Sequence, residues 1–445
     1  MIRKTPLEAW ISTKIGRHAP GDRLTTMAIR AYQLDTLRET IKYARQSSPF
    51  YRNTLAGFPA SQISCLEDIQ RLPFTTADDI RQDPLRFLSV PQGEISRIVT
   101  LNTSGTTGNS KRLFFTQEDL ELTIDFFCHG MSTLVERGDK VLILLPGDKP
   151  DSVGDLLARG LTRMDVYGLI HGPIREIAPV VKTITQERVN SLVGIPTQIL
   201  ALARSREGSN ITKGSLKSVL LSTDYVPVAI ARELARTWGC SVFNHYGMTE
   251  MGLGGGVECE ALAGYHLREA DLYFEVVDPT TGEPKCEGES GEIVFTTLTR
   301  KGMPLIRFRT GDIARFIPES CPCKTILRRM ERVTGRWDGT VRLGSNGILR
   351  LPDLDEALFP LPWLLNYRAI LSQDGKNDCL GIEAYVVPGS DPKEHQVHEA
   401  LKKVPAVAEG LAMGCMTLAP VKISKQNWTT TGIAKRSIID NRERI

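Results

Sequence analysis

Two hydrophobic periods follow one another along the chain, and the first is helical. Over residues 26–47 apolar side chains recur every three or four positions and fall on one helical face; they are Leu34, Leu37, Ile41 and Ala44. Pro49 follows this segment, and a proline disfavours helical geometry at the residue before it. We therefore expect a helix that ends before Pro49 and a mainly helical start to the chain.

Beyond residue 135 the pattern changes to short apolar runs that end at proline, glycine or polar turns. The runs are Val141–Leu145, Leu192–Ile195, Val219–Leu221 and Ile293–Thr297. Longer stretches with helical spacing lie between them, namely Thr197–Arg204 and Val228–Trp238. Strands that alternate with helices predict an α/β fold with layered sheets, some of whose strands are parallel.

A domain boundary is expected near Gly335 and Gly339, which bracket a short charged segment. About a hundred residues follow it, enough for one small domain. The sequence thus predicts a large N-terminal domain over residues 1–336 and a small α+β domain over residues 337–445.

Composition and charge narrow the function classes. The chain has 445 residues, of which 41% are hydrophobic and 24% charged, and this excludes a disordered or fibrous protein. A net charge of +3 gives no general attraction to nucleic acid or to an anionic membrane. Nine cysteines at low density argue against a disulfide scaffold and favour a reducing, cytoplasmic location. A homodimer stays an open alternative.

A run of small polar residues before Lys111 has the chemistry of a phosphate-binding loop. Residues 101–111 read LNTSGTTGNSK. Glycines let backbone N–H groups approach an anion, hydroxyls add donors, and a lysine balances the charge. The spacing of Gly105 and Gly108 is not that of a Walker A loop. A polar surface turn is the alternative.

Two later segments carry the side chains that a nucleotide site needs. Residues 244–250 read NHYGMTE, in which an aromatic ring can stack on a base and a carboxylate can hold Mg²⁺. Residues 307–312 read RFRTGD, whose carboxylate can accept hydrogen bonds from a ribose. Taken singly, each segment also fits an ordinary loop.

In this order the three segments resemble the core motifs of the AMP-forming adenylating enzymes, and in particular the phenylacetate–CoA ligase branch. The resemblance extends from the helical N-terminus to Gly335–Asp338 and covers nearly the whole chain. It implies an acid–thiol ligase that uses ATP and Mg²⁺ to adenylate an aromatic or arylacetic acid and then transfers the acyl group to coenzyme A. The open alternatives are a different acceptor, such as a carrier thiol or an amine, and a catalytically impaired nucleotide-binding homologue.

The resemblance also assigns nucleotide contacts to positions of this sequence. Phosphates would be bound by Thr103, Ser104, Gly105, Thr106, Thr107, Gly108 and Lys111. The adenine would be lined by Ser222, Thr223 and Asp224, and Tyr246 would stack on it. The rest of that motif would contact the nucleotide through Gly247, Met248 and Thr249.

Further positions would serve catalysis and domain rotation. By the same resemblance, Glu250 would hold Mg²⁺ and Asp312 would bind the ribose hydroxyls, with Arg336 nearby. The small domain would rotate about a hinge at Asp338, and Gly344 would lie in the loop beside coenzyme A.

The C-terminal tail departs from the family pattern. The family places a catalytic lysine directly after a glycine, but here Ile433 follows Gly432. Lys435 lies two residues farther along, and in extended backbone such residues share a face. We expect Lys435 to substitute; Arg436 reaching in from another angle, or two solvated tail charges, are the alternatives.

Four side chains suit a structural zinc ion. They are Cys259, His266, Cys321 and Cys323, a Cys₃His set of the kind that binds Zn²⁺ tetrahedrally. Their spacing alone is irregular, and it is the resemblance that favours zinc. Such an ion would tie the loop after Glu250 to the loop after Asp312.

The glycine-rich run at residues 251–256, MGLGGG, has two interpretations. The resemblance puts it beside the acyl pocket, where missing side chains would leave room for a substrate. The alternative is a flexible turn that leads into the zinc-binding loop.

Overall fold

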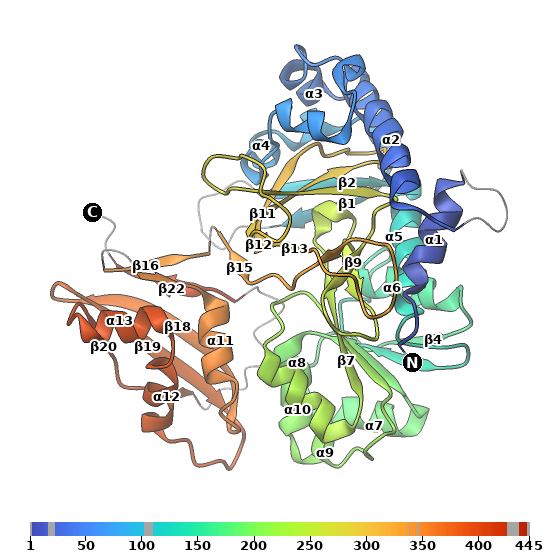
Figure 1. Cartoon of the computed structure of the whole chain (residues 1–445). Helices are drawn as coiled ribbons and strands as arrows, with labels where there is room; N and C mark the ends of the chain where they lie inside the picture. The colour runs from blue at the N-terminus through green and yellow to red at the C-terminus, as the bar shows by residue number, and fades with distance from the viewer. Residues whose placement is uncertain are drawn as a thin grey trace. The chain divides into compact units, whose positions relative to one another are not determined.

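Two compact units make up the chain, and each combines stretches that are far apart in sequence. A computed structural model describes residues 2–16, 23–101, 110–337, 339–344, 347–424 and 436–442 (Figure 1). Unit 1 contains Met1–Arg137, Lys149–Val166 and Phe243–Arg332. Unit 2 contains Gly138–Asp148, Tyr167–Val242 and Val333–Ile445. The domain boundary expected at residue 337 stays a prediction.

The helices of unit 1 come mostly from its N-terminal part. They are α1 (Pro6–Ile15), α2 (Thr26–Ser47), α3 (Pro49–Thr54), α4 (Ala77–Gln82), α5 (Gln117–Met131) and α6 (Val153–Thr162), with 3₁₀ turns η1 (Ala60–Gln62), η2 (Leu66–Arg71), η3 (Pro84–Phe87), η4 (Gln92–Glu94) and η5 (Thr249–Met251). The predicted long helix is confirmed as α2. It begins where the Thr25 hydroxyl accepts the amide of Ala28, and it ends at Ser47, two residues before Pro49.

The strands of unit 1 are mainly antiparallel. They are β1 (Ile95–Leu101) and β2 (Lys111–Thr116), the meander β10 (Leu272–Val277), β11 (Gly291–Thr297) and β12 (Phe308–Ala314), and the set β7 (Ser241–Tyr246), β8 (Gly256–Glu258), β9 (Tyr265–Leu267), β14 (Arg329–Met330) and β13 (Phe316–Ile317). The turn after β7 and the strand β12 carry the second and third polar segments. All seven residues of β11 are buried, as its β-branched and aromatic composition leads one to expect.

Unit 2 begins with a parallel sheet in the order β4 (Tyr167–Ile170), β3 (Lys140–Ile143), β5 (Ser191–Gly194) and β6 (Ser218–Leu221). Its crossover helices are α7 (Ile177–Glu187), α8 (Pro196–Arg204), α9 (Arg206–Ser209) and α10 (Val228–Trp238). Each apolar run predicted here forms a strand, and both predicted helices are present within one residue of their expected bounds. The sheet's carboxyl ends lead into polar loops, where ligands of such sheets usually bind.

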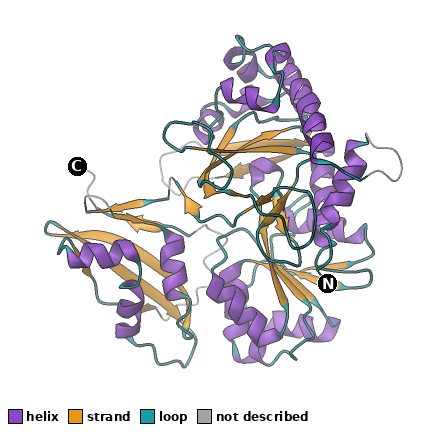
Figure 2. Ribbon diagram, viewed as in Figure 1, coloured by secondary structure: helices purple, strands orange, loops and turns teal. Residues whose placement is uncertain are grey.

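The rest of unit 2 is an α+β layer built on the long hairpin of β18 (Leu364–Asp374) and β19 (Asn377–Val386). The other elements of this part of the chain are β15 (Gly335–Arg336), β16 (Val341–Leu343), β17 (Gly347–Leu349), β20 (Met416–Leu418), β21 (Lys422–Ser424), β22 (Ile438–Asp440), α11 (Leu351–Leu358), α12 (Glu394–Leu401) and α13 (Pro405–Ala412), of which β20, β21 and β22 pair with the hairpin. One hydrophobic cluster runs through unit 2, with members from Leu142 to Met416. Helices and strands are mixed in both units, as an α/β protein requires (Figure 2).

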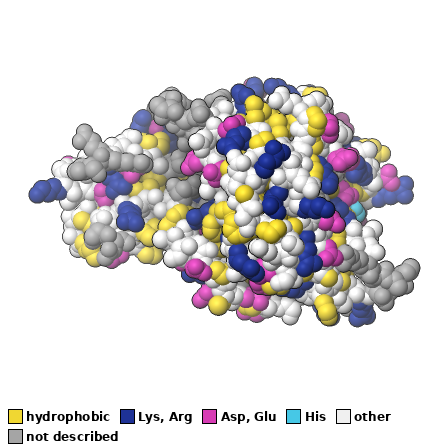
Figure 3. All heavy atoms as spheres, turned by 90° about the horizontal axis from the view of Figure 1, so that it is seen from above, with side chains coloured by type: hydrophobic (Ala, Val, Ile, Leu, Met, Phe, Trp, Pro, Cys, Tyr) yellow, Lys and Arg dark blue, Asp and Glu magenta, His cyan; other side chains and the backbone are white. Residues whose placement is uncertain are grey.

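On the face drawn in Figure 3, lysine and arginine side chains are interspersed with acidic and apolar ones. Among the described residues, none of the helices has both the length and the apolar character that crossing a bilayer requires.

Candidate nucleotide site and metal centre

Lys111 and Glu250 meet in the interior of unit 1. Lys111 opens β2, and Glu250 lies in the turn η5 that follows β7. The Lys111 ammonium donates to one carboxylate oxygen of Glu250, and only 13% and 3% of the two side chains are exposed. Arg300 donates to the Glu250 backbone carbonyl at 2.7 Å, and this hydrogen bond holds the turn in place. The fold thus brings together two predicted site residues that lie 139 positions apart.

The glycines after Glu250 pack closely instead of lining an open space. Gly252 ends η5 in the left-handed region, with φ of 71°, where glycine is least strained. A Cβ atom at Gly254 would lie 2.3 Å from the ring of Phe126, and one at Gly255 would lie 2.8 Å from the sulfur of Met251. The room for substrate that the run was expected to leave is therefore occupied by protein at Gly254 and Gly255. Because Gly254 and Gly255 have no side chains, Phe126 and Met251 can pack directly against them.

Tyr246 and Asp312 form a second buried pair in unit 1. The Tyr246 hydroxyl donates to Asp312 Oδ2 at 3.0 Å. The Tyr246 ring stacks on Tyr265 with 5.7 Å between ring centroids. Burial, together with the nearby Asp312 carboxylate, raises the pKa of Tyr246 well above its usual value, so the phenol stays protonated and remains a donor. Glu250, the last residue of the second motif, thus contacts Lys111, and Asp312, the last residue of the third, contacts Tyr246. Both pairs lie in unit 1.

His245, directly before Tyr246, packs against two phenylalanine rings. Its ring centroid is 6.2 Å from that of Phe126 and 6.4 Å from that of Phe127. Burial lowers the pKa of His245 to about 4, so the imidazole is neutral at physiological pH. A neutral, packed ring suits a structural role beside the motif.

In unit 2, the predicted adenine loop leaves the carboxyl end of β6. The Ser222 amide donates to the Gly194 carbonyl at 3.1 Å. Thr223 then has φ of 76°, a conformation in which a β-branched residue is strained. Strain of this kind is often found at ligand sites. Asp224 follows, and one of its oxygens accepts the amide of Tyr225 at 2.9 Å.

The remaining predicted residues are divided between described and undescribed parts of the chain. Arg336 lies in β15, and Gly344 follows β16 with φ of 53° and donates its amide to Asp378 at 2.9 Å. Outside the described residues lie Thr103, Ser104, Gly105, Thr106, Thr107, Gly108, Asp338 and Lys435. Gly247, Met248 and Thr249 form the turn between Tyr246 and Glu250.

Arg436 is not a solvated tail charge. Its guanidinium donates to both oxygens of Asp355, at 2.7 and 2.8 Å, and to Asp224 at 2.9 Å. Asp355 was not predicted as a site residue, and no signal in the sequence pointed to it, since an aspartate in an amphipathic helix usually faces solvent. Here it is fully buried in α11.

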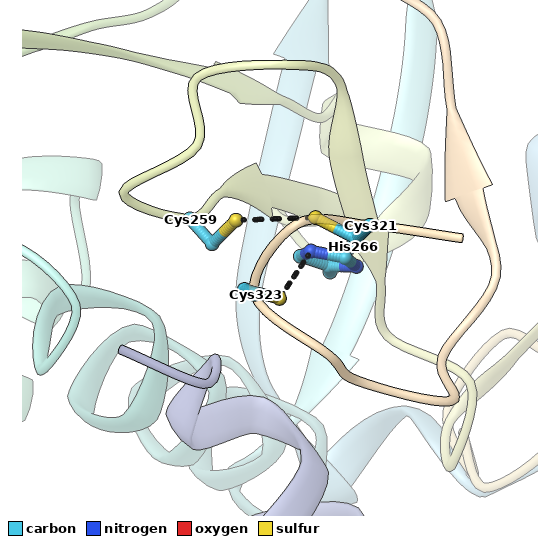
Figure 4. A group of neighbouring side chains, drawn as sticks. All are labelled: Cys259, His266, Cys321 and Cys323. Carbon is cyan, nitrogen blue, oxygen red and sulfur yellow. Dashed lines mark hydrogen bonds between the residues drawn. The ribbon is translucent and has the colours of Figure 1, made fainter. Parts of the chain in front are cut away.

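The four predicted zinc ligands converge in unit 1. Cys259 directly follows β8 and His266 lies in β9, while Cys321 and Cys323 come from the loop between β13 and β14. The four side chains point toward one another in Figure 4, and all are buried. Their ligand atoms lie within 4.8 Å of one another. Antiparallel pairing of β8, β9 and β14 brings the two loops together.

The distances in this cluster fit a tetrahedral ion better than a disulfide. The sulfurs of Cys259 and Cys321 are 3.6 Å apart, and Cys323 Sγ is 3.5 Å from His266 Nε2. A disulfide needs about 2.05 Å between sulfurs. With Zn–S bonds of about 2.3 Å, the edge of a tetrahedron is about 3.8 Å. Backbone donors also face the sulfurs, as when the Ala261 amide points at Cys259 Sγ from 3.4 Å.

The N-terminal helix is fastened to the cysteine loop. Glu8 of α1 accepts the Thr325 hydroxyl at 2.6 Å and the Ile326 amide at 3.1 Å. These two residues lie just beyond Cys323. The cluster therefore joins the loop after Glu250, the loop after Asp312 and the start of the chain.

Known proteins are similar to this chain over most of its length. The AMP-binding enzyme family matches residues 66–298. The chain is similar to the phenylacetate-coenzyme A ligase of Thermus thermophilus, with 28% identity over 86% of this chain and 88% of that protein. It is 30% identical to the phenylacetate-coenzyme A ligase of Pseudomonas putida over 72% of this chain and 73% of that protein. The resemblance expected from the motifs is thereby confirmed.

A solved structure supports the fold over almost the full length. The 2-hydroxyisobutyryl-CoA ligase in its postadenylation state, in complex with R3-HIB-AMP, superposes with a TM-score of 0.79 at 20% identity. The match covers 96% of this chain and 94% of that one, and it confirms the predicted fold class. The family match spans more than half of the 445 residues. The chain belongs to the AMP-binding enzyme family.

Proposed function

We propose that the protein is an ATP-dependent, AMP-forming carboxylic acid–CoA ligase that acts on an aromatic or arylacetic acid. The observation that carries the proposal is the contact between Lys111 and Glu250, within a chain whose family is known. A buried lysine beside a buried carboxylate can hold a polyphosphate and its cation together. The names of the relatives favour coenzyme A as the acceptor.

Each predicted side chain has a role that suits its chemistry. Glu250 offers a carboxylate to Mg²⁺, which prefers oxygen ligands and keeps several waters. Lys111, with its partner engaged by the metal, would turn to the phosphates. Tyr246 would present its ring to the adenine, and Asp312, which accepts a hydrogen bond from Tyr246, would offer its carboxylate to a ribose hydroxyl.

The chemistry consists of two transfers. In the first, a carboxylate oxygen of the acid attacks the α-phosphorus of ATP, and the bond to the bridging oxygen breaks to release pyrophosphate. In the second, the thiol sulfur attacks the acyl carbon, AMP leaves, and the thiol proton passes to solvent. Fixed cations stabilise the charge that develops on phosphate oxygens without having to reorganise. Lys111 and Lys435 are the residues proposed for this task.

Three further parts of the proposal concern structure and location. Zn²⁺ would be held by Cys259, His266, Cys321 and Cys323, where it would fix two motif-bearing loops of unit 1. Residues 337–445 would act as a mobile lid that excludes water between the two transfers. The nine cysteines are all free thiols, which suits a reducing cytoplasm.

The direct test is pyrophosphate release from the purified protein with ATP and Mg²⁺, across a panel of arylacetic, benzoic and short aliphatic acids, with and without coenzyme A. We expect one acid to stimulate release strongly and to yield a thioester only when coenzyme A is present. Release without any dependence on coenzyme A would point to another acceptor. Bound nucleotide with no release for any acid would contradict the ligase and favour an impaired homologue.

Variants at Glu250 and Lys435 test the assigned roles. Glu250→Gln keeps the size of the side chain but removes its charge, and we expect adenylation to fall by about 10²–10³-fold. Glu287→Gln, at an exposed glutamate of the same unit, is the matched control. Lys435→Ala should lower adenylation by a similar factor, and Lys403→Ala, at an exposed lysine of unit 2, should not. Full adenylation activity in Lys435→Ala would refute the substitution of the missing lysine by Lys435.

A further inference from the structure

Arg436 bridges two carboxylates that come from distant parts of unit 2. Its Nη1 and Nη2 atoms donate to Asp355 Oδ1 and Oδ2 at 2.7 and 2.8 Å, which is the bidentate geometry of strong arginine–carboxylate pairs. Its Nε atom donates to Asp224 Oδ2 at 2.9 Å. All three guanidinium nitrogens are thus engaged, and the side chain is held in one orientation.

The bridge lies in a largely apolar surrounding. The Asp355 side chain has no exposed surface, and 11% of the Arg436 side chain is exposed. The rings of Phe359 and Tyr367 lie 5.3 and 5.9 Å from the guanidinium carbon. The Tyr367 hydroxyl also donates to Asp355 Oδ1 at 2.6 Å. Because water is excluded, these hydrogen bonds are strong, and a broken one has no ready replacement.

Each partner of Arg436 belongs to a different element. Asp224 follows the strained Thr223 in the predicted adenine loop, and Asp355 is in α11. Arg436 lies two residues before β22, whose Ile438 pairs in parallel with Ala369 of β18. That register places Arg436 alongside Tyr367. One side chain therefore joins the last strand, α11 and the adenine loop.

A second set of contacts fastens α11 to the far end of the same loop. Glu356, the neighbour of Asp355, accepts the Tyr225 hydroxyl and the Val228 amide, both at 2.8 Å. The loop from Asp224 to Val228 is therefore tied to α11 through Asp355, by way of Arg436, and directly through Glu356. The Val228 contact also orients the start of α10, since Val228 is its first residue.

We propose that Arg436 is a positioning residue that holds the adenine loop against the C-terminal segment for the adenylating half-reaction. This inference rests on the proposed ligase function. Lys435, the proposed catalytic lysine, directly precedes Arg436 in the sequence and lies outside the described residues. Adenylation needs both the loop and Lys435. Thioester formation from a preformed acyl adenylate does not need the lysine, and it should tolerate loss of the bridge.

The experiment measures the two half-reactions separately in Arg436→Lys and in Arg442→Lys. Arg442 is a matched control in the same tail, because its ion pairs are with Asp440 and Asp378 and do not involve the adenine loop. We expect Arg436→Lys to lower acid-dependent pyrophosphate release by about 10²-fold. Thioester formation from synthetic acyl adenylate and coenzyme A should stay within about threefold of the wild type. An equal loss in both half-reactions, or the same loss in Arg442→Lys, would overturn the proposal.

Hydrogen exchange separates a failure of this inference from a failure of the ligase function. The amides of Tyr225 and Val228 are bonded to Asp224 and Glu356, and their exchange can be followed in the free protein. Arg436→Lys should accelerate exchange at Tyr225 by at least tenfold, whereas Arg442→Lys should leave it unchanged. Unchanged exchange in Arg436→Lys overturns the bridge even if the ligase is active. If the wild type adenylates no acid, the exchange result still decides whether Arg436 holds the loop. Asp355→Asn, which keeps the side-chain size, serves as a second variant should Arg436→Lys not fold.

Discussion

The Cys/His cluster of unit 1 and the Arg436 cluster of unit 2 both hold distant segments of the chain together, but only the Arg436 cluster contains a positively charged side chain. Each fastens segments that are far apart in the chain: Cys259 and Cys321 are separated by 62 positions, and Arg436 and Asp224 by 212. The first cluster supplies four ligands and no cation. The second contains its own cation, a single guanidinium that two carboxylates share.

This difference decides what each cluster needs in order to form. Thiolates brought together without a cation would repel one another, so under the proposed zinc binding the Cys/His cluster would be completed by a metal ion from solution. The Arg436 cluster is complete as soon as the chain folds, although its charges must be taken out of water. Metal supply should therefore control the stability of unit 1 and leave unit 2 unaffected.

The largest effect should come from breaking the Cys/His cluster. Structural zinc contributes on the order of 10 kcal/mol to the folding of small zinc domains, which is comparable to the whole stability of a typical domain. We expect Cys321→Ser to lose the metal and to unfold the loops around Glu250 and Asp312. Elemental analysis should find one zinc per chain in the wild type and none in the variant, and thermal unfolding should show an early transition.

Cys286→Ser provides the control for that experiment, because Cys286 is an exposed thiol of the same unit. It should retain both the zinc and the wild-type transition. A fully folded, active protein from which all zinc has been removed would show that the cluster is held by its hydrogen bonds alone, and the contrast between the two clusters would disappear.

The next largest effect should come from removing one partner of the Arg436 cluster. Asp355→Ala leaves a buried guanidinium without its bidentate partner, which typically costs about 3–5 kcal/mol. The double variant Asp355→Leu/Arg436→Met leaves no buried guanidinium unpaired, so it should regain part of that free energy of unfolding, while Asp224 and the Tyr367 hydroxyl each lose a hydrogen-bond partner. Urea denaturation measures the free energy of unfolding of both variants, and hydrogen exchange of the β18 amides measures the stability of unit 2 in each. A double variant no more stable than Asp355→Ala would show that the charges themselves hold unit 2 together.

The sequence predicted the elements well because their determinants are local. The limits of α2 follow from a helical stripe and the proline at position 49, and the parallel strands follow from apolar runs that end at turns. The convergence of the Cys/His cluster was also predicted, because the Cys-x-Cys pair was suggestive and the family resemblance made up for the irregular spacing of the four residues. The division of the chain into two discontinuous units was not visible, because it depends on contacts between distant segments.

The Arg436 cluster could not be predicted for a related reason. Aspartate and arginine are common on protein surfaces, and nothing local distinguishes Asp355 from an exposed aspartate of an amphipathic helix. Only the pairing of β22 with β18 brings Arg436 beside it. The close packing of Gly254 against Phe126 was missed in the same way, since glycine in a sequence shows a missing side chain but not what fills its place.

Glu269 sharpens the comparison, because here a buried carboxylate has neither a metal nor an ion-pair partner in direct contact. It lies two residues after β9 and is 5% exposed, and its carboxylate accepts the Arg328 amide at 3.1 Å. Burial, partly offset by the charge of Arg328, raises the pKa of Glu269 to about 7. Below a pH of about 7 this carboxyl group is therefore protonated and carries no charge.

The smallest predicted effect follows from the protonation of Glu269. The folded state binds it more tightly than the unfolded state does, so the free energy of unfolding should fall as the pH rises from about 4.5 to about 7, by roughly 3 kcal/mol in all. Glu269→Gln should remove this slope, because an amide does not titrate, and should be more stable than the wild type at pH 8 but not at pH 4.5. Urea denaturation at both pH values measures the difference, with the exposed Glu287→Gln as the control. Parallel pH profiles for wild type and Glu269→Gln would mean that Glu269 is already ionised, with Arg328 as its cation, and unit 1 would then resemble unit 2 in carrying its own counter-charge.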